Sequence, residues 1–154
     1  MFIFLDIDGV MVPAKGWQSP ELLNDGFPAF SNKATCVLQS LISEDATIML
    51  ITSHKSNYTL DEWKAIFNKR GINVEIIKSL GNNVDNLSRK DEIIKWFNIN
   101  NNINEFVIID DDKSLNSLPD NLKKNLVLIN PMVGLSDEHL ENIKAIRKKE
   151  LQFT

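Results

Sequence analysis

Five short segments of the chain are almost continuously hydrophobic, and longer mixed stretches separate them. The segments cover residues 1–6, 46–52, 74–77, 106–110 and 126–130. Three of them, MFIFLD, ATIMLIT and FVIID, show little alternation between apolar and polar positions. Strands have this composition when both of their faces are covered, as in a parallel sheet between two layers of helices. The pattern therefore predicts five strands in a mostly parallel central sheet.

Helical patterns lie between these hydrophobic segments. TLDEWKAIFNKRG places Thr59 and Glu62 in capping-box spacing. A serine that suits an N-cap begins two further patterns: Ser88 in SRKDEIIKWF, and Ser136 after the first residue of LSDEHLENIKAIRKK. Two further helices are expected at residues 32–42 and 115–123. The alternation of strands and helices predicts a doubly wound α/β domain.

The chain of 154 residues fits one domain that spans residues 1–154. Its longest irregular stretch, residues 11–31, is predicted to form a flap over the functional site. Trp17 of this stretch is expected to pack over the core, and the alternative is stacking on a nucleic-acid base. Cys36 is the single cysteine, so the chain alone builds neither a disulfide nor a cysteine zinc site. We expect Cys36 to be a small buried residue of a helix.

Charge and hydropathy exclude other classes of protein. The net charge of -4 argues against a strongly cationic nucleic-acid coat, although a local basic groove remains compatible with it. The N-terminal segment lacks the basic start and the length of a signal peptide. No apolar run approaches the roughly 20 residues that span a bilayer. We therefore expect a cytoplasmic protein that has no membrane partner.

Unusual polar residues stand at the predicted carboxyl ends of several strands, or at the start of a helix that returns to the same edge. Ligands of open α/β sheets bind at this edge. The residues are Asp6, Asp8, Thr52, Ser53, Lys90, Asp110, Asp111 and Asp112. Carboxylates crowded together repel one another and are costly to desolvate. A divalent cation with oxygen ligands removes both penalties, and Mg²⁺ suits two or three carboxylates that leave room for a phosphate oxygen.

This set of residues can carry out phosphoryl transfer. Asp6 is placed to attack phosphorus as a carboxylate nucleophile. Asp8 is placed to give a proton to the leaving group and to take one from water. Thr52 can hydrogen-bond a phosphate oxygen, and Lys90 can offset negative charge. Three neighbours are candidates for contact with substrate: Gly9, which allows a sharp turn below the bound group, Ser53 and His54.

The order of these motifs resembles a known superfamily. DIDGV, IMLITS, the lysine of SRKDEIIKWF and FVIIDDD are similar to the four motifs of the haloacid dehalogenase (HAD) superfamily, over about residues 1–130. The resemblance implies a three-layer Rossmann-like core and a Mg²⁺-dependent phosphohydrolase. It implies that Asp6 is the nucleophile, Asp8 the general acid/base, Thr52 the second-motif hydroxyl and Lys90 the third-motif cation. ITSH is similar to HAD domains of polynucleotide phosphatases and RNA-repair proteins.

The resemblance also implies a metal site and an open shape. The Asp6 carboxylate, the Asp8 backbone carbonyl and an acid of the fourth motif would hold the metal. Asp110 and Asp111 are the favoured acids, with Asp111 as the direct ligand, whereas Asp112 is expected to be an outer group or solvated. Neither gap that carries a cap in other members is long enough for a cap domain. An open site of this kind implies a phosphorylated macromolecule as substrate, such as a nucleic-acid end or a phosphoprotein.

Two functions from other classes stay open at this point. A catalytically idle relative would keep the fold and bind a partner. A receiver-type signalling domain also arranges paired acids, a threonine and a lysine around Mg²⁺. In a receiver, however, the phosphorylated aspartate ends a middle strand and the lysine follows a late strand. Here the acids come first, and Lys90 precedes the DDD segment.

Overall fold

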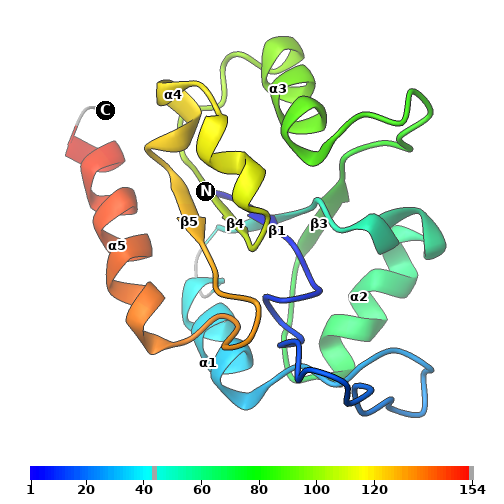
Figure 1. Ribbon diagram of the computed structural model, residues 1–154. Helices are drawn as coiled ribbons and strands as arrows, with labels where there is room; N and C mark the ends of the chain where they lie inside the picture. The colour runs from blue at the N-terminus through cyan, green and yellow to red at the C-terminus, as the bar shows by residue number, and fades with distance from the viewer. Residues whose placement is uncertain (43–44, 153–154) are drawn as a thin grey trace.

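The computed structural model describes residues 1–42 and 45–152 of the chain, with side chains up to residue 149 (Figure 1). The predicted domain of residues 1–154 thus includes two final residues outside the described part. Among the described residues the sheet has five strands, all parallel, and its fold class is the predicted one. The strands are β1 (Phe2–Leu5), β2 (Thr47–Leu50), β3 (Ile76–Ser79), β4 (Phe106–Asp110) and β5 (Leu126–Leu128).

The order of the strands marks one edge of the sheet as the place for a ligand. The order is β3-β2-β1-β4-β5, so the chain winds outward from β1 to β3 and then returns to add β4 and β5 on the other side (Figure 1). Leu5 of β1 pairs with Leu50 of β2 and with Ile109 of β4. Ligands of doubly wound sheets bind beyond the carboxyl ends of the strands, where the winding reverses. In this chain that place lies just after β1 and β4.

Helices cover both faces of the sheet, as the continuous apolar strands require. Ile3 and Leu5 belong to the core shared with α1, α2 and α5, whereas Phe4 belongs to the core on the opposite face, shared with α3 and α4. This alternation follows the two-residue period of a strand. The helices are α1 (Asn32–Leu41), α2 (Leu60–Lys69), α3 (Arg89–Ile99), α4 (Asp120–Lys123) and α5 (Asp137–Gln152).

The helix predicted at residues 115–123 is two separate elements in the structure. A 3₁₀ helix, η2 (Lys113–Ser117), ends before Leu118, and α4 begins after Pro119. Leu118 has an extended backbone with ψ 151°. Proline disfavours the helical conformation of the residue before it and donates no backbone hydrogen bond of its own. The prediction was therefore wrong about continuity, because it passed over the break that Pro119 imposes.

The flap predicted at residues 11–31 contains no helix and no strand of the main sheet. Arg70, at the end of α2, holds it in place. The guanidinium of Arg70 donates to the backbone oxygens of Phe27 and Pro28 at 2.8 and 3.0 Å, and it pairs with the Asp25 carboxylate at 2.7 Å. The side chain of Arg70 is only 2% exposed. The flap is therefore an anchored loop at this end.

Two predictions about single residues are wrong. Trp17 does not pack over the core but is 92% exposed, because Phe27 and Phe30 of the same flap fill that space. Cys36 is exposed, because the inward stripe of α1 consists of Ala34, Val37, Leu38 and Leu41. His139 of α5 has a side chain only 14% exposed, and its Nδ1 accepts a hydrogen bond from the Ser136 backbone N–H at 3.0 Å.

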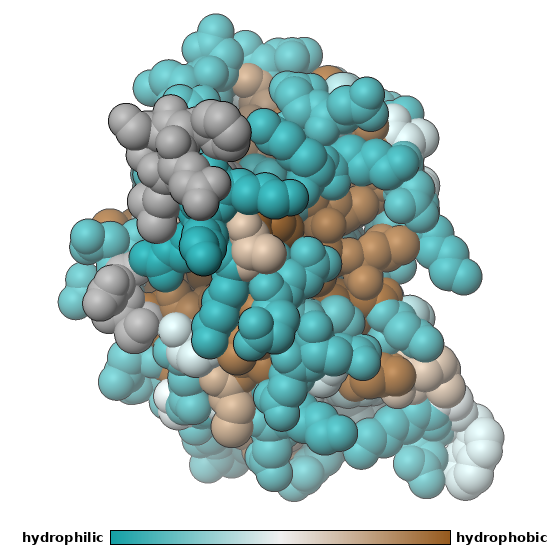
Figure 2. Space-filling model, turned by 90° about the vertical axis from the view of Figure 1, so that its left-hand side faces the viewer, coloured by the Kyte–Doolittle hydropathy of each residue, from teal (hydrophilic) through white to brown (hydrophobic). Residues whose placement is uncertain are grey.

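The last helix turns its apolar residues inward. Ile143 and Ile146 of α5 are buried, while Lys144, Lys148 and Lys149 point to solvent. Figure 2 shows that hydrophilic side chains predominate on this side of the molecule. Within the part of the chain that the structure describes, no helix has the length and apolar content needed to cross a membrane.

Candidate active site

Three aspartates gather at the edge of the sheet where the winding reverses. Asp6 follows β1, Asp110 ends β4, and Asp111 comes next. One carboxylate oxygen from each of the three lies within 4.8 Å of the others. Asp6 is 5% exposed and Asp110 is completely buried. The parallel pairing of β1 with β4 thus produces the acidic cluster from two segments about 100 residues apart.

The cation beside this cluster is Arg89, the first residue of α3. Its NH1 donates to Oδ2 of Asp110 at 2.6 Å and lies 3.4 Å from Oδ1 of Asp6. Lys90, the cation that the sequence favoured, is the next residue and is half-buried. Among the described residues no ion pair joins Lys90 to the cluster. Arg89 was not among the residues predicted from the sequence, although both cations stand in the first turn after the N-cap Ser88.

The electrostatics of the cluster call for a further positive charge. Burial, together with the charge of Asp110, raises the pKa of Asp6 to about 9, although Arg89 acts in the opposite direction. Burial also raises the pKa of Asp111. Three carboxylates face one guanidinium here, so the ionised cluster keeps a net charge of −2. Oxygen ligands in such a set fit a hard divalent cation, and the residues present are suited to holding one.

Gly9 allows Asp111 to approach β1 closely. The backbone of Gly9 has φ +80°, a conformation that side chains disfavour. A Cβ atom built on Gly9 would lie 2.1 Å from Oδ2 of Asp111 and 2.7 Å from its Cγ. The sequence predicted that Gly9 serves a sharp turn below a bound group. In the structure it also makes room for the third carboxylate of the cluster.

Asp8 lies apart from the three clustered carboxylates. Its side chain is 59% exposed, and Oδ2 lies 2.8 Å from Nε2 of His54. The edge of Phe27, a flap residue, packs against the His54 ring with 5.7 Å between ring centroids. The flap anchored by Arg70 thus supports His54, which in turn holds the Asp8 carboxylate. This placement leaves the Asp8 side chain accessible to a substrate.

The second polar segment follows β2. Thr52 is completely buried, and its hydroxyl accepts a hydrogen bond from the His54 backbone N–H at 3.3 Å. It caps the 3₁₀ helix η1 (Ser53–Asn57). Trp63 of α2 donates from its indole nitrogen to the Lys55 backbone oxygen at 3.2 Å, which fixes η1 against the helix behind it. Because β2 pairs with β1, this puts Thr52 and exposed Ser53 at the same edge as Asp6.

Asp112 has a local structural task. Its Oδ1 accepts hydrogen bonds from the Ser114 backbone N–H at 2.9 Å and from the Ser114 hydroxyl at 2.7 Å. It therefore caps η2. Its own backbone N–H donates to Oδ1 of Asp110 at 3.1 Å, which helps to fix that buried carboxylate. Of the three consecutive aspartates, Asp110 and Asp111 are therefore members of the cluster, whereas Asp112 helps to hold Asp110 in place.

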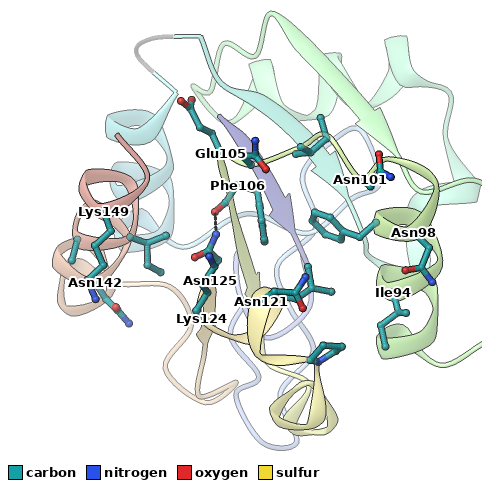
Figure 3. A pocket seen from close by; sticks show the side chains of 17 residues that line it. Ile94, Asn98, Asn101, Glu105, Phe106, Asn121, Lys124, Asn125, Asn142 and Lys149 are labelled. Carbon is teal, nitrogen blue, oxygen red and sulfur yellow. Dashed lines mark hydrogen bonds between the residues drawn. The ribbon is translucent and has the colours of Figure 1, made fainter. Parts of the chain in front are cut away.

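A cavity of about 850 Å³ lies away from these residues (Figure 3). It opens at the amino end of β4, between α3, α4 and α5, and Phe106 and Phe97 form part of its wall. Figure 3 shows Asn98, Asn101, Asn121 and Asn142 around it. Among its described lining residues, Glu105 is the one acid. The cavity therefore lacks the clustered carboxylates that phosphoryl chemistry needs.

The fold and the site together define a class of protein. A parallel, doubly wound sheet with an aspartate after β1, two acids at the end of β4 and a cation at the start of α3 is the arrangement of a HAD-type phosphohydrolase domain. A family model described as the HAD domain in Swiss Army Knife RNA repair proteins matches residues 2–140. The chain belongs to this family. Comparison with curated proteins found no match.

Proposed function

We propose that the protein is a Mg²⁺-dependent phosphomonoesterase that forms a phosphoaspartate at Asp6. The observation that carries this proposal is the cluster of Asp6, Asp110 and Asp111 beside Arg89, in which Asp6 and Asp110 are buried. A structural ion pair needs one carboxylate for each guanidinium. Three carboxylates at the ligand edge of the sheet are in excess, and membership of the HAD family gives that excess a chemical reason.

The carboxylates of Asp6 and Asp111 and the backbone carbonyl of Asp8 would hold the metal, with Asp110 beside them. Bound there, Mg²⁺ would supply the positive charge that keeps Asp6 ionised and draws a phosphate toward it. The raised pKa of Asp6 supports the need for that charge, because a protonated carboxyl is no nucleophile. Arg89, ion-paired with both Asp6 and Asp110, fixes the direction of the nucleophile and offsets charge on the phosphoryl group.

The proposed reaction uses the side chains around the cluster in two steps, transfer of the phosphoryl group to Asp6 and hydrolysis of the phosphoaspartate. Asp6 attacks phosphorus while the bond from phosphorus to the leaving oxygen breaks. Asp8 gives its proton to that oxygen and then takes one from the water that hydrolyses the phosphoaspartate. His54 orients the Asp8 carboxylate through its 2.8 Å contact. Thr52 and Ser53 offer a hydroxyl and backbone groups to the phosphate oxygens.

The shape of the site supports a large substrate. Residues 80–88, between β3 and α3, form a loop without regular structure, and so does the flap. The described residues hold no cap domain over the acids, so a phosphate on a macromolecule can reach them. The family name refers to RNA repair proteins. We therefore propose a phosphorylated nucleic-acid end as the substrate.

The decisive experiment compares Asp6→Asn and Asp8→Asn over a series of phosphate esters whose leaving groups differ in pKa. Asp6→Asn should abolish turnover for every ester, since the nucleophile is lost. Asp8→Asn should lower turnover by about 10²–10⁴-fold, and less for nitrophenolate, which leaves without protonation. Its Mg²⁺ affinity should stay close to that of the wild type, because the backbone carbonyl remains. Asp61→Asn, an exposed change on α2, serves as the control.

Other outcomes would point to the alternative functions. Undiminished activity of Asp6→Asn would refute the phosphoaspartate mechanism. Mg²⁺ binding with no turnover of any ester would identify an idle relative that binds a partner. A stable phosphoprotein without turnover would indicate a receiver-type domain, although the position of Asp6 after the first strand speaks against it.

A further inference from the structure

A groove of about 630 Å³ opens directly beside the acidic cluster. Arg89 belongs to both, since it contacts Asp6 and Asp110 and also lines the groove. The other walls come from η1, from the loop of residues 80–88 and from the first turn of α3. The group esterified to a phosphate that approaches Asp6, which is the leaving group of the reaction, can extend into this space. Its volume falls in the range of small-ligand pockets, roughly 300–1,000 Å³.

The charges that line the groove are already balanced. Nζ of Lys55 lies 3.1 Å from Oε2 of Glu92, and the two side chains are only 6% and 10% exposed. Arg89 is paired with the acids of the cluster, and Asp112 accepts two hydrogen bonds from Ser114. Each lysine or arginine on the described wall thus has an acidic partner. The groove therefore offers no spare cation for a second phosphate and suits an uncharged group.

The remaining wall has neutral hydrogen-bonding groups and one apolar contact. The side chains of Ser56 and Asn82 are exposed, and the structure records no hydrogen bond for either of them within the described residues. Asn83 holds the loop closed, with hydrogen bonds of 2.7 and 2.8 Å to the Leu87 backbone. The closed loop leaves Val84 84% exposed at the groove. Hydroxyls and an amide beside an apolar surface match a sugar hydroxyl, a base edge and a ring face.

We propose that this groove binds the nucleoside that carries the reacting phosphate. The proposal rests on the proposed phosphatase function and narrows its substrate to the terminal nucleoside of a strand or a nucleoside monophosphate. Asn82 and Ser56 hydrogen-bond the sugar or the base, and Val84 packs against a ring face. The next phosphate of a strand lies outside the groove, because the Lys55–Glu92 pair leaves no cation for it.

The test measures kcat/KM for p-nitrophenyl phosphate, nucleoside 3′- and 5′-monophosphates, a nucleoside bisphosphate and glucose 6-phosphate. p-Nitrophenyl phosphate carries no sugar and reports on the phosphate site itself. Asn82→Ala and Val84→Ala should each lower kcat/KM for a nucleoside monophosphate by about 3- to 10-fold, the value of one lost contact, through a raised KM. Their kcat/KM for p-nitrophenyl phosphate should stay within about twofold. Both residues are exposed, so the variants are expected to fold.

Asn121→Ala is the matched control, because Asn121 is an exposed asparagine that lines the remote cavity of Figure 3. This variant should leave kcat/KM unchanged for both p-nitrophenyl phosphate and the nucleoside monophosphate. Equal losses on both substrates, no loss on the nucleotide, or a wild-type preference for glucose 6-phosphate would overturn the nucleoside site. A wild-type preference of more than tenfold for the bisphosphate would overturn the charge argument. Failure of the wild type to hydrolyse p-nitrophenyl phosphate would overturn the proposed function itself, and this proposal with it.

Discussion

Replacement of Gly9 by alanine separates the stability of the fold from the integrity of the acidic cluster. Alanine in the left-handed conformation costs about 1–2 kcal/mol, and Gly9 has φ +80°. The new Cβ would also lie 2.1 Å from Oδ2 of Asp111. A carboxylate can rotate away at small cost in folding free energy. We therefore expect Gly9→Ala to displace Asp111 and spoil the metal site, while stability falls chiefly by the backbone strain, with a small addition from the 3.1 Å approach to Cβ of Pro131.

Gly26 provides a matched control for this change. It has the same φ of +80°, and a Cβ atom there would meet nothing within 4 Å. Gly26→Ala should pay the same strain and gain the same stiffening of the unfolded chain, so both variants should lose about 2–8 °C in Tm. Only Gly9→Ala should also weaken Mg²⁺ binding and lower turnover of an aryl phosphate, by about 10²-fold or more.

The assays are thermal unfolding without metal, calorimetric titration with Mg²⁺ and steady-state hydrolysis of p-nitrophenyl phosphate. If Gly9→Ala bound Mg²⁺ and turned over substrate as well as Gly26→Ala does, Asp111 would have no part in the metal site. If Gly9→Ala failed to fold while Gly26→Ala folded, the close approach would be a requirement of the core and not of the metal site. Either result would contradict the expectation that Gly9→Ala damages the metal site without damaging the fold.

Three further predictions follow from the site and the flap. Arg89→Met should lower turnover by about 10²-fold or more, as loss of a charge-stabilising donor does. Lys90→Met should change turnover less than tenfold. If kinetic assays gave the reverse order, Lys90 and not Arg89 would be the cation that acts on the phosphate. Metal-free protein should lose stability as pH rises from about 4 toward 9, because folded Asp6 keeps its proton up to a pKa of about 9 and the unfolded carboxyl has a pKa of 3.8. Saturating Mg²⁺ should remove that slope in urea unfolding, and a slope that persisted would show that the metal does not displace the Asp6 proton. Hydrogen bonds from Arg70 lower the pKa of Asp25 to about 2, so the Asp25 contribution is present above pH 3.8 and lost as pH falls through 2. Asp25→Asn should therefore destabilise the protein at pH 7, by about 1 kcal/mol, and the difference from the wild type should shrink as pH falls through 2; a loss independent of pH would contradict the ion pair.

The architecture, and the edge of the sheet that carries the acids, follow from local patterns in the sequence. Continuous apolar strands separated by capped helices require a sheet covered on both faces, and parallel strands must end at a common edge. These two rules are enough to predict that Asp6, Thr52 and Asp110 lie at one edge. They work because they depend on local patterns and on the few ways in which alternating strands and helices can pack.

Which of two neighbouring residues reaches the acidic cluster depends on the packing of the whole fold and not on local sequence. Arg89 and Lys90 are both cations in one helical turn, and successive helical residues point about 100° apart. The rotation of α3, set by the burial of Ile93 and Phe97, brings Arg89 to the acids. Within DDD, only the turn into η2 distinguishes the cap Asp112 from the residues of the cluster.

Partners distant in the chain were equally beyond the sequence. Asp8 and His54 meet across 46 positions, and Arg70 reaches back to the flap at Asp25. Such contacts depend on the exact course of loops, which local propensity does not specify. The same holds for Trp17, which is exposed because other aromatic residues fill the core beneath the flap. Sequence fixes the strands and the edge at which they end, but side chains from separate segments find their partners only once all the layers have packed.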